Sequence, residues 1–132
     1  MISSVTYVAP VVLVVDDEPL VRMTAADELE ESGFHVLEAA SADEALAVLE
    51  EHADDVQVLF TDLNMPGSMD GIGLAEEAHR RWPHILLLIS SGQEQLQPNE
   101  IPDHGHFVAK PYVAAHVVSH IHDLIKGSDL AV

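Results

Sequence analysis

The sequence predicts an α/β fold with a doubly wound, five-stranded parallel sheet. Three observations support this prediction. Short apolar runs alternate with amphipathic helical segments along the whole chain. Runs this short, with polar residues, glycine or proline nearby, are typical of strands buried in a parallel sheet. The 132 residues are enough for one domain with a hydrophobic core.

The first two strands enclose a helix. Residues 11–15 contain only Val and Leu, as expected of a buried strand. Residues 18–32 then carry apolar side chains at helical spacing, and Gly33 is a residue type that commonly ends helices. Residues 34–37 follow as a second, shorter strand.

A capping box predicts the start of the next helix. Ser41 is a favourable N-cap residue, and Glu44 stands three positions later, where its side chain reaches back to the first turn. The helix is expected to run to about residue 51. Residues 56–60 form the third apolar run and the third strand.

The fourth βα unit is less regular than the others. A helix is expected over residues 70–81, followed by a strand over residues 85–89. Between Gly92 and Gly105 the helical pattern fails, and Pro98 and Pro102 interrupt any longer helix. The fourth helix is therefore expected to be short or irregular.

The last strand and helix complete the domain. Residues 106–109 are expected to form the fifth strand, and residues 113–126 the last helix. We expect one domain over residues 8–127, with short tails at 1–7 and 128–132. So few residues follow the last helix that no output domain is expected.

The composition narrows the classes of partner and compartment. Five Lys and Arg stand against 23 Asp and Glu, a formal net charge of -18, which disfavours binding to nucleic acid and anionic lipid. The absence of cysteine excludes disulfides and thiolate metal sites. No signal peptide or membrane-spanning run is recognisable, so we expect a cytoplasmic protein.

Polar side chains follow four of the five expected strands. Asp16 and Asp17 follow the first, Asp62 the third, Ser90 the fourth and Lys110 the fifth. Because ligands of such sheets bind beyond the carboxyl ends of the strands, these side chains are expected to converge on one edge. Grouped carboxylates suit Mg²⁺, which prefers oxygen ligands.

The same set of side chains suits phosphoryl transfer. A carboxylate such as Asp62 can form an acyl phosphate, and a nearby ammonium such as Lys110 stabilises the charge on the phosphoryl oxygens. A hydroxyl from the fourth strand can donate to the phosphoryl group. Ser90 and Ser91 are equally polar, and chemistry alone does not choose between them.

Four segments together resemble the receiver domain of two-component response regulators, a flavodoxin-like (βα)5 fold. They read VVLVVDDEPLVR, VLFTDLNMPGSMDG, LLLISSG and FVAKPY, in this order. The resemblance covers nearly the whole chain. It implies that Asp62 is the phosphoacceptor and that Asp17 binds Mg²⁺ directly. Asp16 would act mainly through water, and Asn64 would offer its backbone carbonyl to the metal.

The resemblance also implies a conformational switch. Ser90 would be the switch hydroxyl and Lys110 the lysine that contacts the phosphoryl group. Phe107 holds the aromatic switch position and lacks the hydroxyl of a tyrosine, so any switching there would use packing alone. The bond between Lys110 and Pro111 corresponds to one that is cis in the family, which proline makes accessible.

The expected function is that of a stand-alone response regulator and not of a conventional enzyme. A histidine kinase or phosphotransfer protein would donate the phosphoryl group, and a downstream protein of unknown identity would respond; a weak homodimer is left open. One alternative is a receiver that binds partners without phosphorylation. Another is a Mg²⁺-dependent phosphatase with an aspartyl-phosphate intermediate, but Asn64 stands where such enzymes need a second Asp.

Nine histidines raise the question of a second metal site. His116 and His120 lie four residues apart on the last helix, a spacing that allows two imidazoles to share a metal. His104 and His106 are also close in sequence. No acidic residue completes a known zinc motif, so the histidines are expected to be surface residues.

Overall fold

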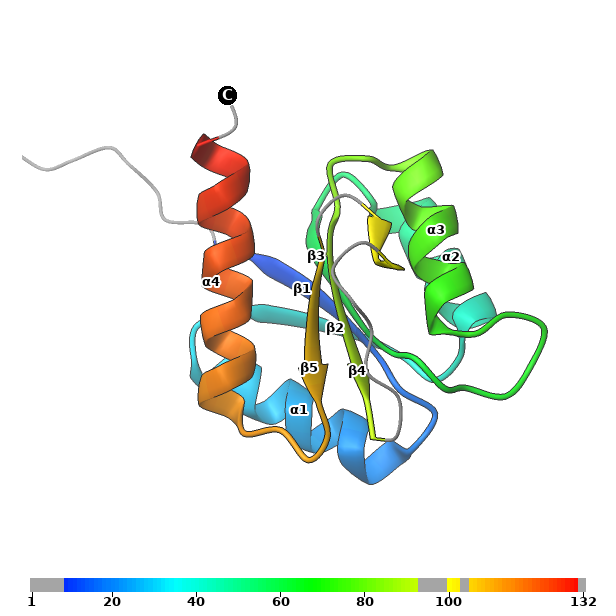
Figure 1. Ribbon diagram of the computed structural model, residues 1–132, viewed down its shortest axis with the longest axis horizontal. Coiled ribbons are helices and arrows are strands. Elements are labelled where there is room, and N and C mark those ends of the chain that lie inside the picture. Colours follow the sequence, from blue (N-terminus) through cyan, green and yellow to red (C-terminus); the bar gives the residue numbers. More distant parts are fainter. Residues whose placement is uncertain (1–8, 93–99, 103–104, 131–132) are drawn as a thin grey trace, which may run out of the picture.

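The computed structural model describes residues 9–92, 100–102 and 105–130 (Figure 1). Its elements, in chain order, are β1 (Val11–Val15), α1 (Pro19–Glu31), β2 (His35–Ala39), α2 (Ala42–His52), β3 (Val56–Asp62), α3 (Gly71–Arg81), β4 (Leu86–Ser91), β5 (His106–Ala109) and α4 (Ala114–Leu130). All neighbouring strands are parallel, in the order β2-β1-β3-β4-β5. This is the flavodoxin-like order, so the predicted five-stranded parallel sheet is confirmed.

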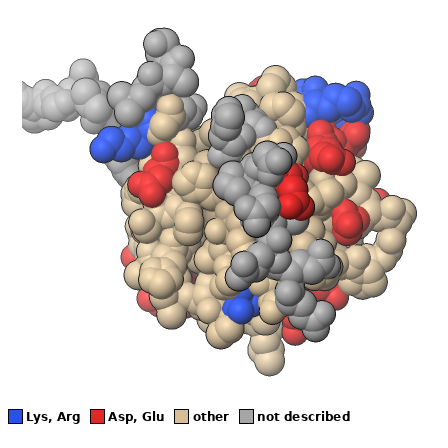
Figure 2. All heavy atoms as spheres, viewed as in Figure 1, with Lys and Arg blue, Asp and Glu red and all other residues tan. Residues whose placement is uncertain are grey.

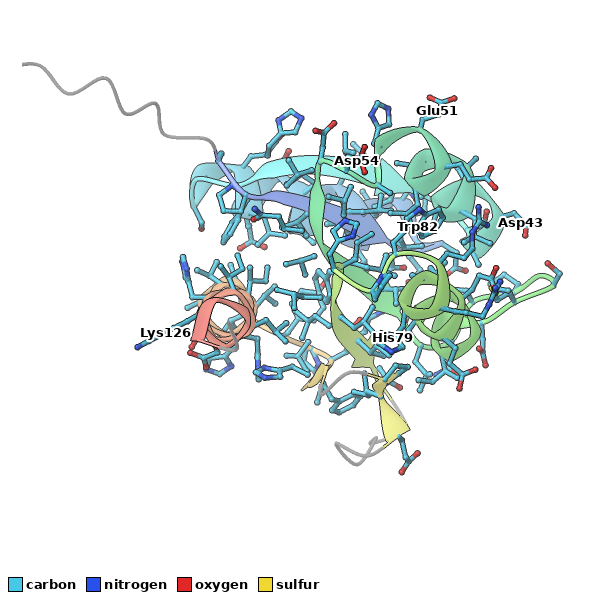
Figure 3. The ribbon with its side chains drawn as sticks, turned by 90° about the horizontal axis from the view of Figure 1, so that it is seen from above. Asp43, Glu51, Asp54, His79, Trp82 and Lys126 are labelled. Carbon is cyan, nitrogen blue, oxygen red and sulfur yellow. The ribbon has the colours of Figure 1, made fainter. Side chains whose placement is uncertain are left out.

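The sheet lies between two layers of helices, with α1 and α4 on one face and α2 and α3 on the other (Figure 3). Successive strand residues alternate between the two faces. In β1, for example, Leu13 and Val15 pack toward α2 and α3, whereas Val12 and Val14 pack toward α1 and α4. Both faces are therefore apolar, which explains why the strands read as continuous hydrophobic runs.

Two predicted helix starts agree with the structure. Ser41 caps α2, because its hydroxyl accepts a hydrogen bond from the Glu44 backbone N–H at 3.1 Å. Asp70 caps α3 in the same way, accepting from the Gly73 backbone N–H at 2.8 Å. Each side chain satisfies an N–H that has no partner within the helix.

Three strands extend further toward their carboxyl ends than the apolar runs predicted. β2 continues to Ala39, β3 includes Thr61 and Asp62, and β4 includes Ser90 and Ser91. The ladder is built from backbone groups, so a polar side chain does not end a strand whose backbone stays paired with a neighbouring strand. The polar residues of β3 and β4 therefore stand on the sheet itself.

Of two other predictions, one lies mainly outside the described residues and the other is partly wrong. The short or irregular fourth helix falls mainly on residues 93–99 and 103–104, which lie outside the described residues. The expectation of surface histidines is wrong for three half-buried residues, His79, His106 and His120. The rings of His106 and His120 are in edge-to-face contact. They come from β5 and α4, so their contact depends on the packing of the two elements and not on sequence spacing.

Among the described helices, none has the length and apolar character needed to cross a bilayer.

Candidate functional site

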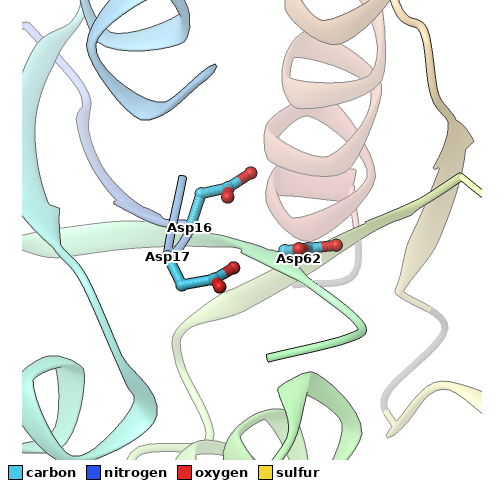
Figure 4. Close-up of side chains that lie close together, drawn as sticks. All are labelled: Asp16, Asp17 and Asp62. Carbon is cyan, nitrogen blue, oxygen red and sulfur yellow. The ribbon is translucent and has the colours of Figure 1, made fainter. Parts of the chain in front are cut away.

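Three carboxylates meet at the carboxyl edge of the sheet (Figure 4). Asp16 and Asp17 directly follow β1, and Asp62 is the last residue of the adjacent strand β3. One carboxylate oxygen from each residue lies within 4.8 Å of the other two. Asp16 and Asp62 are buried, whereas Asp17 is more exposed. The turn after β1 thus brings two consecutive acids to one opening.

Lys110 follows β5 and reaches into this group of acids. Its Nζ donates to Asp16 Oδ2 at 3.1 Å and lies 3.4 Å from Asp62 Oδ2. Its own backbone N–H donates to the Ser91 carbonyl at 2.8 Å, which extends the link between β4 and β5 by one residue. The Lys110–Pro111 peptide bond is cis.

For Asp62 and Lys110, burial and the opposite charge of the partner shift the pKa in opposite directions. Burial raises the pKa of Asp62, the neighbouring Asp16 raises it further, and Lys110 offsets only part of the effect. Burial alone would lower the pKa of Lys110, but its hydrogen bond to Asp16 and the charges of both acids raise it. Lys110 therefore stays cationic beside a carboxylate whose ionised form is destabilised.

The position of Asp16 is fixed from several sides. Its Oδ1 accepts from the Glu18 backbone N–H at 2.9 Å, and its carbonyl accepts from Arg22 Nη1 at 2.8 Å. Arg22 Nε also pairs with Glu38 of β2 at 3.2 Å. Arg22 was not predicted from the sequence to be a site residue. The only signal that singled it out is that basic residues are scarce in this chain, which has five Lys and Arg.

Two hydroxyls and an amide lie on the other side of Asp62. In the β3–β4 ladder Asp62 is paired with Ser90, and both Ser90 and Ser91 are buried. Asn64 Nδ2 donates to Ser91 Oγ at 3.4 Å. The backbone of Asn64 also hydrogen-bonds the Asp62 carboxylate, which works to lower its pKa. The structure therefore places Ser90 beside the acid and engages Ser91 with Asn64.

Phe107 lies outside this polar group. It stands in β5 opposite Ile89 of β4 and is half-buried against the core between the sheet and the α2/α3 layer. The structure thus brings together Asp16, Asp17, Asp62, Ser90 and Lys110, whereas Phe107 belongs to the neighbouring edge of the sheet.

An apolar groove of about 570 Å³ adjoins the site between α1 and the segment that leads into α4. Lys110 stands in its wall, and Leu20 and Tyr112 line it. The Tyr112 ring packs on Phe60 with 5.5 Å between ring centroids, and burial raises the pKa of its hydroxyl to about 12. Leu20 is 80% exposed, and exposed apolar side chains beside a groove are typical of interaction sites. This groove was not predicted from the sequence.

The donor set suits a hard divalent cation. Three carboxylates offer oxygen ligands, and two of them are buried, which is costly for ionised groups that lack a counter-charge. Lys110 supplies one positive charge to Asp16 and Asp62, so the three acids retain a negative excess. Mg²⁺ at this place would be held by Asp16, Asp17 and Asp62 and would neutralise charge on phosphoryl oxygens.

Comparison with known proteins supports the resemblance to receiver domains. A family model described as "Response regulator receiver domain" matches residues 12–122. The chain is 32% identical over 121 residues to the sensor kinase CckA of Brucella abortus, which covers 89% of this chain but 13% of that protein. It is 35% identical over 113 residues to the C4-dicarboxylate transport regulatory protein DctD of Rhizobium meliloti, covering 83% and 24% respectively.

Solved structures agree with this assignment. A receiver domain protein from Clostridium thermocellum superposes with a TM-score of 0.85 at 26% identity, covering 93% of this chain and 99% of that chain. The receiver domain of the hybrid histidine kinase CckA superposes with a TM-score of 0.75 at 32% identity, covering 86% and 97%. With its fold, its acidic site and these matches, the chain belongs to the response regulator receiver domain family.

Proposed function

We propose that Asp62 accepts a phosphoryl group from a phosphohistidine of a histidine kinase or phosphotransfer protein, in a Mg²⁺-dependent reaction. The observation that carries this proposal is the position of Lys110 Nζ, 3.1 Å from Asp16 and 3.4 Å from Asp62 at the edge of the three-acid group. An ammonium beside an acceptor carboxylate is suited to stabilising the charge of a transferring phosphoryl group.

The transfer uses the groups around Asp62 as follows. A carboxylate oxygen of Asp62 attacks phosphorus while the bond from phosphorus to the donor imidazole nitrogen breaks, and that nitrogen keeps the electron pair. Lys110 offers its N–H groups to the phosphoryl oxygens, and the Ser90 hydroxyl donates from the neighbouring strand. Bound Mg²⁺ supplies neutralisation of the phosphoryl charge. The resulting contact with Ser90, together with repacking of Phe107, is the proposed switch that changes partner binding.

The proposed role of the chain is that of a signalling phosphoacceptor in the cytoplasm, with residues 8–127 as the receiver domain. Its proposed reactions are self-catalysed phosphotransfer and dephosphorylation. The chain spans less than a quarter of the length of the two curated relatives described above. The activities of those whole proteins are not transferred to it, and its response is proposed to pass to a separate downstream protein.

A small phosphodonor tests the acceptor directly. With acetyl phosphate and Mg²⁺, the wild-type chain should gain the mass of one phosphoryl group, and Asp62→Asn should gain none. Asp54→Asn is the matched control, because Asp54 is an exposed acid before the start of β3, at the opposite end of the strand from Asp62. Persistent labelling of Asp62→Asn, or equal loss in Asp54→Asn, would contradict the assignment.

The groove between α1 and the segment leading into α4 predicts where the protein donor docks. Leu20→Ser removes an apolar side chain that is 80% exposed, so the fold should tolerate it. We expect slower phosphotransfer from a kinase or phosphotransfer protein, but an unchanged rate with acetyl phosphate, which needs no docking surface. Equal rates from the protein donor in wild type and variant would show that the groove is not the docking site.

A further inference from the structure

Two histidines, His106 of β5 and His120 of α4, lie in contact with each other outside the acidic site. His106 Nδ1 and His120 Nδ1 face each other at 3.0 Å, and the two rings meet edge to face with an interplanar angle of 84°. Both residues are half-buried, so their side chains are held by the packing of strand against helix. With no ion bound, such a contact requires one ring to donate N–H and the other to accept it.

We propose that His106 and His120 form a binding site for a borderline transition-metal ion such as Zn²⁺. Two nitrogens 3.0 Å apart can share one ion at the usual Zn–N length. With Zn–N bonds of about 2.05 Å the angle at the metal is roughly 95°, and separating the rings by about 0.3 Å makes it tetrahedral. The ion replaces the proton that the two nitrogens otherwise share.

The surroundings favour a cation at this place. Asp123 follows His120 by three residues and His116 precedes it by four, so all three share one face of α4. Asp123 is close enough to His120 to influence its titration, as is His116, and both are exposed. Among the described residues, neither brings a ligand atom within 4.8 Å of both imidazole rings, so water would complete the coordination of the ion. The net charge of -18 attracts cations to the whole molecule.

His120 is also suited to bind metal near neutral pH. Burial lowers its pKa, and the neighbouring His106 and His116 lower it further, while Asp123 opposes them. The neutral imidazole needed by a metal ligand is therefore favoured. Imidazole selects Zn²⁺, Cu²⁺ or Ni²⁺ over Mg²⁺, which prefers oxygen, so this site and the three-acid group differ in the ions they bind.

Isothermal titration of the full chain with Zn²⁺ tests the proposal. The chain carries no added histidine tag, and Mg²⁺ is present in large excess to compete at the three acids. We expect one Mg²⁺-resistant site, weakened by about tenfold or more in His106→Gln and in His120→Gln. His122→Gln is the matched control, because His122 lies on the same helix but its ring packs against Phe34.

Wild-type affinity in both variants would overturn the proposal, as would the absence of a Mg²⁺-resistant site in the wild type. A second measurement does not depend on how the variants fold. In long-range proton–nitrogen spectra of the wild-type chain, Zn²⁺ should shift the imidazole nitrogen signals of two or more histidines while Mg²⁺ shifts none. Unshifted imidazole signals at saturating Zn²⁺ would equally overturn the site.

Discussion

At the scale of single residues, Asp62 combines a position in the candidate site with a cost to stability. Its carboxylate is buried beside two other acids, and Lys110 compensates only part of the charge. Folding must therefore place a negative charge where its hydration is poor and its neighbours repel it. Buried ionised groups beside like charges are common in functional sites, because the same charge attracts a cation or a transferring group.

The raised pKa of Asp62 gives a prediction for Asp62→Asn. The folded protein binds the Asp62 proton more tightly than the unfolded chain does, so at pH values above the raised pKa the ionised group destabilises the fold. Without Mg²⁺, we expect the variant to be more stable than wild type near neutral pH. The difference should shrink as the pH falls toward 3.8, the ordinary pKa of the group.

Urea unfolding of both proteins at two pH values, in chelator, measures this difference. Added Mg²⁺ should stabilise wild type more than Asp62→Asn, because the variant lacks one of the three carboxylates. A variant that is less stable than wild type at neutral pH, or a stability difference that grows on acidification, would contradict the stated sign.

At the scale of elements, the start of α3 is built against the backbone of Asp62, the proposed phosphoacceptor. The Gly71 N–H donates to the Leu63 carbonyl at 2.9 Å, which folds the loop after β3 back onto the strand. A Cβ at position 71 would lie only 2.0 Å from the Asp62 carbonyl oxygen and 2.8 Å from Leu63 Cα. Both obstacles are backbone atoms, which cannot move without shifting the site.

This contact predicts that Gly71→Ala is disruptive. Overpacking of this kind costs about 1–3 kcal/mol, and more where backbone must move. Gly73→Ala is the matched control in the same helix, because its Cβ would meet first the flexible Met69 side chain at 2.9 Å. We expect a clear loss of stability and of phosphorylation with acetyl phosphate for Gly71→Ala and little change for Gly73→Ala. Equal urea midpoints for the two variants would refute the tight approach of α3.

The elements also show what could be predicted from the sequence. The strand Val11–Val15, the N-cap Ser41 and the helix start near residue 70 depend on local chemistry, and the structure confirms them. The convergence of acids from β1 and β3 followed from a general property of parallel sheets. The Arg22 contact with the Asp16 carbonyl depends on side-chain direction, which periodicity does not encode. The contact of His106 with His120 depends on how β5 packs against α4.

At the scale of the whole molecule, charge and core oppose each other. An apolar layer packs on each face of the sheet, while the chain as a whole carries a formal net charge of -18. On the face shown in Figure 2, basic side chains occur only as small isolated patches. Several of the basic groups are already paired, including Arg80 with Glu77 and Arg81 with Glu50. Most of the acids therefore repel one another through solvent.

This imbalance predicts that salt stabilises the fold. Raising NaCl from about 10 mM to about 300 mM shortens the screening length severalfold and should increase the free energy of unfolding. MgCl₂ at the same ionic strength should stabilise wild type further, because the three acids are proposed to hold the ion. Asp17→Asn should lose much of that extra gain while keeping the response to NaCl. Urea unfolding in matched series separates the two effects. Stability that is unchanged or lowered by NaCl would show that ion pairs, and not like-charge repulsion, dominate the surface of this molecule.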